Sequence, residues 1–224
     1  MRRIAWIGVA LCAGCGGSAP PPEHAHGDVV EVPVPRDTAP PALAIGSDGH
    51  VAATGLPAIA RASEVVVVAV QDGSGLRVDV RDRDDKTLRS FAATPAQPSL
   101  DAANKQLAML HGVHDLRAMT PLAVEAGHDH EDQHWATGDN LDVEWRDHRL
   151  SVFRHNANAA LVEADGAPWL PPERGACRNP AFLRAAYHGA MTSSLVIDIG
   201  YRDGDGGDCR APADQLHVVT WYDH

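Results

Sequence analysis

The residues best suited to chemistry gather in one short stretch, 127–135, which reads GHDHEDQHW. Its histidines and acids alternate closely along the chain: His128, Asp129, His130, Glu131, Asp132 and His134. Neutral imidazole and carboxylate groups are common ligands of zinc. The stretch is therefore a candidate metal site, with His128, His130 and His134 as its ligands.

The spacing of His130, Glu131 and His134 is HExxH, which resembles the signature of the zincin metallopeptidases over five residues. The resemblance implies a helix that presents His130 and His134 to a zinc ion. It also implies that Glu131 acts as general base for the zinc-bound water. One departure is Asp132, a charged residue where zincins generally keep uncharged ones.

A second partial resemblance is to the HxHxDH motif of metallo-β-lactamase-like hydrolases, which His128, His130 and Asp132 match and Gln133 breaks. Residues 128–137 also lack the apolar stripe with which a helix packs on a core. We therefore expect a solvated acidic loop between strands. The alternatives are a non-catalytic metal site and an exported zinc-dependent hydrolase that uses Glu131 as its catalytic residue.

The first residues of the chain predict export. Arg2 and Arg3 precede an apolar run over residues 4–13, which has the charge and length of a secretory signal peptide. The run is too short to span a bilayer comfortably. Cleavage by the ordinary signal peptidase near residues 17–19 would release a soluble secreted form.

Residues 12–15, Cys-Ala-Gly-Cys, resemble the lipobox of bacterial lipoproteins, and the likeness extends over residues 1–18. The resemblance implies that residues 1–14 are removed as a signal peptide and that Cys15 is lipidated. The partner implied is a membrane, reached through the lipid. Gly16 after the cysteine implies sorting to the outer membrane of the cell envelope.

Two cysteines remain for the exported domain, because Cys12 leaves with the signal and Cys15 is lipidated or also removed. Oxidising compartments favour disulfides, so we expect Cys177 and Cys209 to be bonded. Closing their loop of about 33 residues stabilises the fold by about 3.7 kcal/mol on the chain-entropy model. Two unpaired buried thiols are the alternative.

The charge balance excludes one large class of partners. The chain carries 30 acids and 19 basic residues, a formal charge of −11, and removal of residues 1–14 leaves 17 basic residues and a charge of −13. Nucleic-acid binding needs clustered Lys and Arg and is not expected. There is no GxxxxGK[ST] and no GxSxG, so neither nucleotide binding nor a serine nucleophile has support. We expect a binding or structural role, with a protein or small-molecule ligand that the sequence does not identify.

Seven prolines over residues 16–42 predict an extended tether that begins at Cys15. Alternating or continuous apolar runs beyond it predict strands. These cover residues 43–45, 51–53, 65–70, 76–80, 88–91, 122–124, 141–145, 150–153, 194–201 and 216–222.

Two helices are expected among these strands. Ser99 is a plausible N-cap for the first, and Gly112 is well placed to end it. The second is a short helical stretch over residues 180–187. Together the elements predict a predominantly β, α+β domain over residues 43–224. Antiparallel meanders would form a twisted sheet or sandwich with one helix packed against it, and two lobes meeting near residue 130 are an alternative arrangement.

Overall fold

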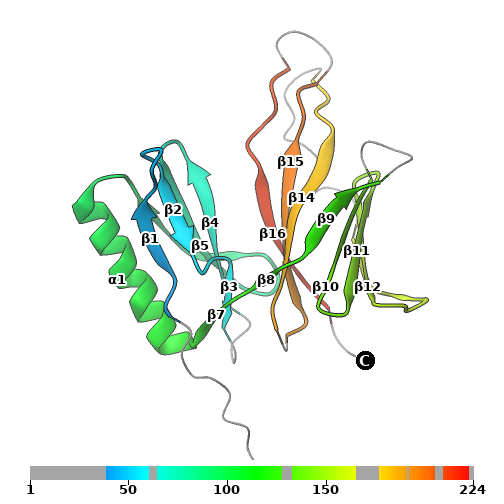
Figure 1. Cartoon of the computed structure of the whole chain (residues 1–224), viewed down its shortest axis with the longest axis horizontal. Coiled ribbons are helices and arrows are strands. Elements are labelled where there is room, and N and C mark those ends of the chain that lie inside the picture. The colour runs from blue at the N-terminus through cyan, green and yellow to red at the C-terminus, as the bar shows by residue number, and fades with distance from the viewer. Residues whose placement is uncertain are drawn as a thin grey trace, which may run out of the picture. The chain divides into compact units, whose positions relative to one another are not determined.

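The computed structural model describes residues 39–60, 65–127, 133–164, 177–190, 192–204 and 209–221 (Figure 1). Within these ranges the chain forms sixteen strands and one helix. All strand pairs are antiparallel and build a two-stranded sheet, two five-stranded sheets and one four-stranded sheet. The predominantly β fold with a single helix confirms the predicted fold class.

The first sheet has the strand order β6-β5-β4-β3-β7. Its strands are β3 (Ala58–Ala60), β4 (Val66–Asp72), β5 (Gly75–Arg81), β6 (Thr87–Ala93) and β7 (Leu116–Ala118). A separate hairpin of β1 (Ala42–Ile45) and β2 (Val51–Thr54) shares its apolar cluster. The strand predictions at 43–53, 65–70, 76–80 and 88–91 are confirmed. β5 differs in one respect, because its polar row of residues includes Asp79 and Arg81, which are buried.

Helix α1 (Gln97–His114) lies beside the β1–β2 hairpin and the first sheet (Figure 1). Its Leu100, Ala103 and Leu107 enter the apolar cluster of that sheet. The first predicted helix is confirmed, but its predicted ends are wrong. A proline in the first turn suits the start of a helix, so α1 begins two residues before Ser99 without a side-chain cap. It continues past Gly112 until Asp115 takes a left-handed conformation, whose backbone N–H donates to the carbonyl of His111 at 2.9 Å.

The middle sheet has the order β16-β15-β14-β8, and the third sheet the order β13-β12-β11-β10-β9. The strands of the middle sheet are β8 (Thr120–Pro121), β14 (Ala181–His188), β15 (Ser194–Tyr201) and β16 (Gln215–Thr220). Those of the third sheet are β9 (Ala123–Ala126), β10 (His134–Gly138), β11 (Leu141–Arg146), β12 (Arg149–Arg154) and β13 (Ala160–Ala164).

The helix predicted over residues 180–187 is wrong, because this segment is strand β14. Its composition suits a helix, yet it pairs with β15 on one side and with β8 on the other. Ladder hydrogen bonds and burial in the centre of a sheet override such weak local preferences. A β-bulge interrupts the register between Leu183 and Ala185, at Arg184.

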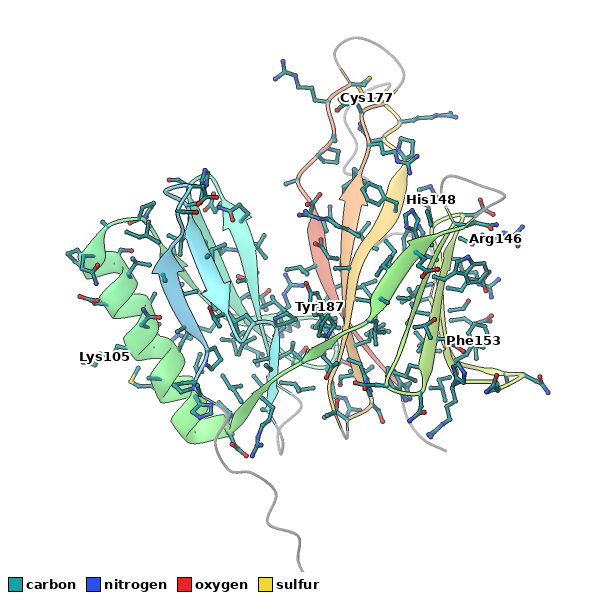
Figure 2. All side chains as sticks on the ribbon, in the orientation of Figure 1. Lys105, Arg146, His148, Phe153, Cys177 and Tyr187 are labelled. Carbon is teal, nitrogen blue, oxygen red and sulfur yellow. A yellow bond between two sulfur atoms is a disulfide. The ribbon has the colours of Figure 1, made fainter. Side chains whose placement is uncertain are left out.

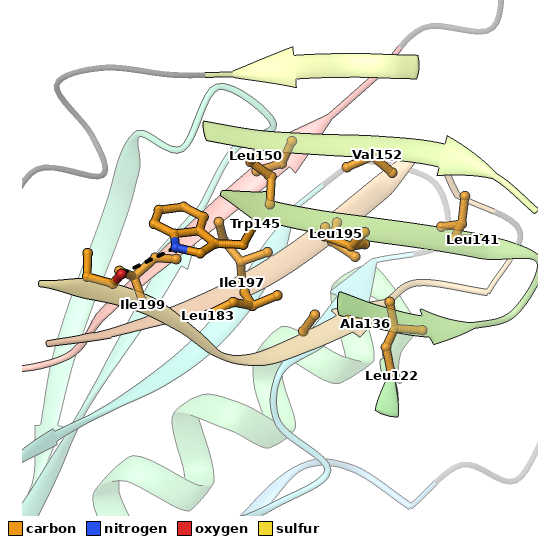
Figure 3. Close-up of a cluster of buried hydrophobic side chains, with 14 of the residues drawn as sticks. Leu122, Ala136, Leu141, Trp145, Leu150, Val152, Leu183, Leu195, Ile197 and Ile199 are labelled. Carbon is orange, nitrogen blue, oxygen red and sulfur yellow. Dashed lines mark hydrogen bonds between the residues drawn. The ribbon is translucent and has the colours of Figure 1, made fainter. Parts of the chain in front are cut away.

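The middle sheet is covered on both faces. Toward the third sheet, Leu195, Ile197 and Ile199 enter a large apolar cluster around Trp145 (Figure 3). The indole nitrogen of Trp145 donates to the Ala181 carbonyl at 3.3 Å, which satisfies its one polar atom. Toward the first sheet, a smaller cluster joins the two sheets: Ile59, Val66, Val68, Met119, Val196 and Val218.

The predicted disulfide between Cys177 and Cys209 is present, with 5.2 Å between the Cα atoms. It joins the segment before β14 to the segment that connects β15 with β16, at one end of the middle sheet (Figure 2). The bond indicates an oxidising, exported environment. Among the described residues, no helix is long and apolar enough to cross a membrane.

Candidate functional site

The predicted histidine site is only partly within the described residues. His128, His130 and Glu131 lie outside them, as does Cys15. His134 is described, and it is the first residue of strand β10 with 9% of its surface exposed. The helical geometry that the HExxH resemblance implies is therefore absent at His134.

The His134 ring lies beside the ring of Phe182, with 5.6 Å between their centroids. This contact places the imidazole at the interface between the third and middle sheets. In the part of the chain that the structure describes, no group of three or more His, Cys, Asp or Glu side chains is placed to hold a metal ion.

A cleft of about 770 Å³ lies between the middle sheet on one side and the first sheet with the β1–β2 hairpin on the other. Volumes of this size suit drug-sized ligands. Much of the lining is apolar and includes Val51, Leu56, Val68, Val70 and Leu216. The middle sheet and the loop before β16 add four polar side chains: Arg184, Tyr187, Asp198 and Asp214.

The cleft begins where the apolar contact between the first and middle sheets ends, which is at Asp198 on β15. Val196 on β15 faces the first sheet and packs there with Val66 and Val68. Side chains two apart on a strand share a face, so Asp198 occupies the next position of the same row. The apolar contact between the sheets includes Val196 but not Asp198, which lines the cleft instead.

Asp198 is a desolvated carboxylate. Only 18% of its side chain is exposed, and its burial raises the pKa of this carboxyl above the ordinary value, an effect that the nearby Arg184 partly offsets. The Nε of Arg184 lies 3.8 Å from Oδ2 of Asp198. The other oxygen, Oδ1, is buried and has no hydrogen-bond partner among the described residues. Such an unsatisfied group opposes folding and is typical of a functional site.

Arg184 links two carboxylates at the mouth of the cleft. Its guanidinium pairs with Asp198 and also with Asp214, on the loop before β16. The bulge in β14 is the local cause, since bulges re-aim the side chain that they carry. The arginine remains more than half exposed, so both ion pairs lie at the boundary between the cleft and solvent.

Tyr187 lines the cleft and packs against the apolar cluster between the first and middle sheets. Figure 2 shows its side chain between these two sheets. Burial raises the pKa of its phenol, and the negative charge of Asp198 raises it further. The hydroxyl therefore stays protonated at neutral pH and is a hydrogen-bond donor.

A polar clamp fastens the two walls of the cleft together. Asp85, in the β5–β6 turn, accepts from the backbone N–H of Val218 at 2.9 Å and lies 2.9 Å from the ring of His217. Arg81 pairs with Asp85 at 2.8 Å and also donates to the carbonyl of Leu216. These contacts join the first sheet to β16 and hold the cleft walls at one separation.

A second cavity of about 650 Å³ lies among the turns that join the strands of the third sheet, next to the β14–β15 turn. His188 lines it and stacks on Trp221, with 6.1 Å between the ring centroids. The histidines of this cavity face neighbouring protein groups. His188 Nε2 lies 3.2 Å from the Thr192 carbonyl and His188 Nδ1 lies 3.6 Å from Oδ2 of Asp139, while His155 Nδ1 lies 3.2 Å from Oδ1 of Asp142. We therefore place the candidate site in the first cleft.

Sequence reasoning missed this site although one signal was present. The segment 194–201 reads SLVIDIGY, in which Asp198 is the only charged residue of a strand buried on both faces. A carboxylate in such a buried strand indicates a specific role, because burying a charge costs free energy. Arg184 gave no comparable signal, since its role depends on the bulge.

Comparison of the chain with protein-family models, with curated protein sequences and with solved structures finds no match.

Proposed function

We propose that this protein is an exported, lipid-anchored binding protein of the cell envelope that holds a small ligand in the cleft between its first and middle sheets. The observation that carries the proposal is the cleft itself. It combines an apolar lining with convergent polar groups, and it contains the desolvated carboxylate Asp198. This is the usual composition of a small-molecule site.

The anchor part of the proposal rests on the sequence. A lipid on Cys15 would hold the domain at a membrane, and the Pro-rich residues before β1, 16–41, would act as the spacer. An extended polyproline-like tether of this length reaches up to roughly 80 Å. The cleft would then sample the space next to the membrane, where an envelope protein meets its ligand.

The binding role is tested with Nile red, a neutral apolar dye that fluoresces when it leaves water. We expect saturable binding of about one dye per protein. Val70→Trp fills the cleft wall and should weaken binding about tenfold or more. Val113→Trp is the matched control, because Val113 is exposed on α1, away from the cleft. Equal affinity of the two variants would contradict the proposed cleft.

The anchor is tested separately by cell fractionation. Cys15→Ser removes the acylated thiol, so the variant should move from the membrane fraction to the soluble fraction. Metabolic labelling with a radioactive fatty acid gives the second measurement, and label should appear only on the parent protein. Full membrane retention of the variant would exclude a lipid anchor at this residue while leaving the binding role intact.

A further inference from the structure

The charges that line the cleft do not balance. Among the described lining residues, Asp48, Asp198 and Asp214 supply three carboxylates, whereas Arg184 supplies one guanidinium. Counted over these Asp and Arg side chains, the described lining has a net formal charge of −2. The whole chain is acidic as well, with a charge of −11. The electrostatic potential of the cleft therefore favours a positively charged ligand.

Arg184, the one cation among the described lining residues, is already paired with carboxylates. Arg184 pairs with Asp198 at 3.8 Å and also pairs with Asp214. Both carboxylates lie against this guanidinium, so an anionic ligand that approached Arg184 would also meet two negative charges. A cationic ligand meets no such repulsion from them, and the Asp214 side chain is 39% exposed, so its carboxylate can accept a further donor.

The remaining lining tells what the rest of the ligand must be. Val51, Leu56, Val70 and Leu216 offer apolar surface next to the carboxylates. Tyr187 adds an aromatic ring that packs on the apolar cluster and also lines the cleft. Aromatic faces attract ammonium groups, and apolar walls favour a hydrophobic body. A cleft of about 770 Å³ has room for both.

We infer that the cleft takes a small organic cation, an amine or quaternary ammonium compound with an apolar body. This inference rests on the proposed binding function and names its ligand class. The ammonium group lies against Asp214 and Asp198 at the mouth, and the apolar body lies along Val70 and Leu216. Arg184 orients the two carboxylates, and Tyr187 contributes its ring to the cation.

The experiment compares three probes of one shape on the purified full-length protein. These are phenethylammonium, its neutral isostere 2-phenylethanol, and the anion 3-phenylpropionate. Isothermal titration up to a concentration on the order of 10 mM covers the affinity expected of such small molecules. We expect the cation to bind at least tenfold more tightly than the neutral probe, and the anion to bind least. The preference should shrink as salt is raised, because charge attraction is screened.

Two variants locate the preference. Asp214→Asn removes a carboxylate from the mouth of the cleft and should lower the affinity for phenethylammonium about fivefold or more, leaving 2-phenylethanol unchanged. Asp147→Asn is the matched control, because it removes an equal charge from an exposed turn of the third sheet. That control should leave both affinities unchanged.

The outcomes separate this inference from the function on which it rests. Equal binding of the cation and the neutral probe overturns the cation inference and leaves a ligand-binding cleft. An equal loss of affinity in Asp214→Asn and Asp147→Asn also overturns it, because the preference would then come from the overall charge of the protein. If none of the three probes and no Nile red binds to the folded protein, the proposed function fails as well.

Discussion

The two faces of the middle sheet are built on opposite principles. Leu195, Ile197 and Ile199 face the third sheet and are completely buried in the cluster around Trp145 (Figure 3). The opposite face begins in the same way with Val196 but continues with Asp198. Strand β15 therefore contributes to a closed core on one face and to an open cleft on the other. The difference follows from the residue types at alternate positions along the strand.

The difference also shows how an open interface is held. The closed face is stabilised by apolar burial, and this stabilising free energy is roughly proportional to the apolar area removed from water. The face toward the first sheet has a smaller apolar cluster and is reinforced by the contacts of Arg81 and Asp85 with β16. Directional polar contacts fix the spacing of two walls without filling the space between them. A binding cleft needs this kind of support.

The largest loss of stability is expected for a substitution on the closed face, which packs on the third sheet. Trp145→Ala removes a fully buried side chain and should lower the free energy of unfolding by about 3–5 kcal/mol. Val70→Ala on the cleft wall is the matched control and should cost less than about 1.5 kcal/mol. Urea denaturation followed by circular dichroism measures both. A similar loss in the two variants would show that the faces do not differ in packing.

A smaller loss of stability is expected for removal of the disulfide at one end of the middle sheet. Replacing Cys177 and Cys209 by serine removes the bridge and should cost about 2–4 kcal/mol. Asn179 lies beside the bridge and donates to the carbonyls of Arg202 and Cys209 at 2.9 and 3.2 Å. These bonds should keep the ends aligned without the sulfurs. Thermal unfolding of the double variant measures the loss, and recovery of free thiols from the oxidised parent would contradict the bridge.

The clamp should respond to acid in a defined direction. Burial raises the pKa of Asp85, but hydrogen bonds from His217, Val218 and Arg81 outweigh it and leave this pKa below the ordinary value of 3.8. The unfolded chain therefore binds the proton first, so the contribution of Asp85 is complete above pH 3.8 and is lost as the pH falls below it. Asp85→Asn should cost about 1–2 kcal/mol at neutral pH. The gap between parent and variant should narrow in acid, as measured by urea denaturation at several pH values.

The smallest effect should have the opposite sign. Burial raises the pKa of Asp198 above 3.8, so its favourable contribution is complete below pH 3.8 and is lost as the pH rises through the folded-state value. Asp198→Asn removes the buried charge and should stabilise the protein at neutral pH by less than about 1 kcal/mol. The same variant should bind phenethylammonium more weakly. A variant that is less stable at neutral pH would mean that Asp198 supports the fold and not the cleft.

Local patterns in the sequence predict the strands well where they are strong. Residues 194–201 combine a continuous apolar run with turn residues on both sides, and β15 has these bounds. The segment 181–188 fails because its alanines, leucine and arginine suit a helix, and only pairing with β8 and β15 makes it a strand. Short strands such as β3 and β7 carry too few residues for any periodicity.

The candidate site was less predictable than the fold, for a physical reason. Asp198 stands out in its strand, but Asp48, Arg184 and Asp214 are ordinary surface residue types that only the folded chain brings to one cleft. The histidine motif had the stronger pattern, yet His134 lies in a strand. A site assembled from the facing surfaces of separate sheets leaves no spacing rule in the sequence.

Residues 116–126 pass through all three large sheets in turn. They form β7, β8 and β9, which are the edge strands of the first, middle and third sheets (Figure 1). If one sheet unfolds and releases its edge strand, the adjoining edge strand of the next sheet is disturbed as well. The sheets should consequently melt together in one cooperative transition, and a single protease cut within these residues should turn that transition into separate ones.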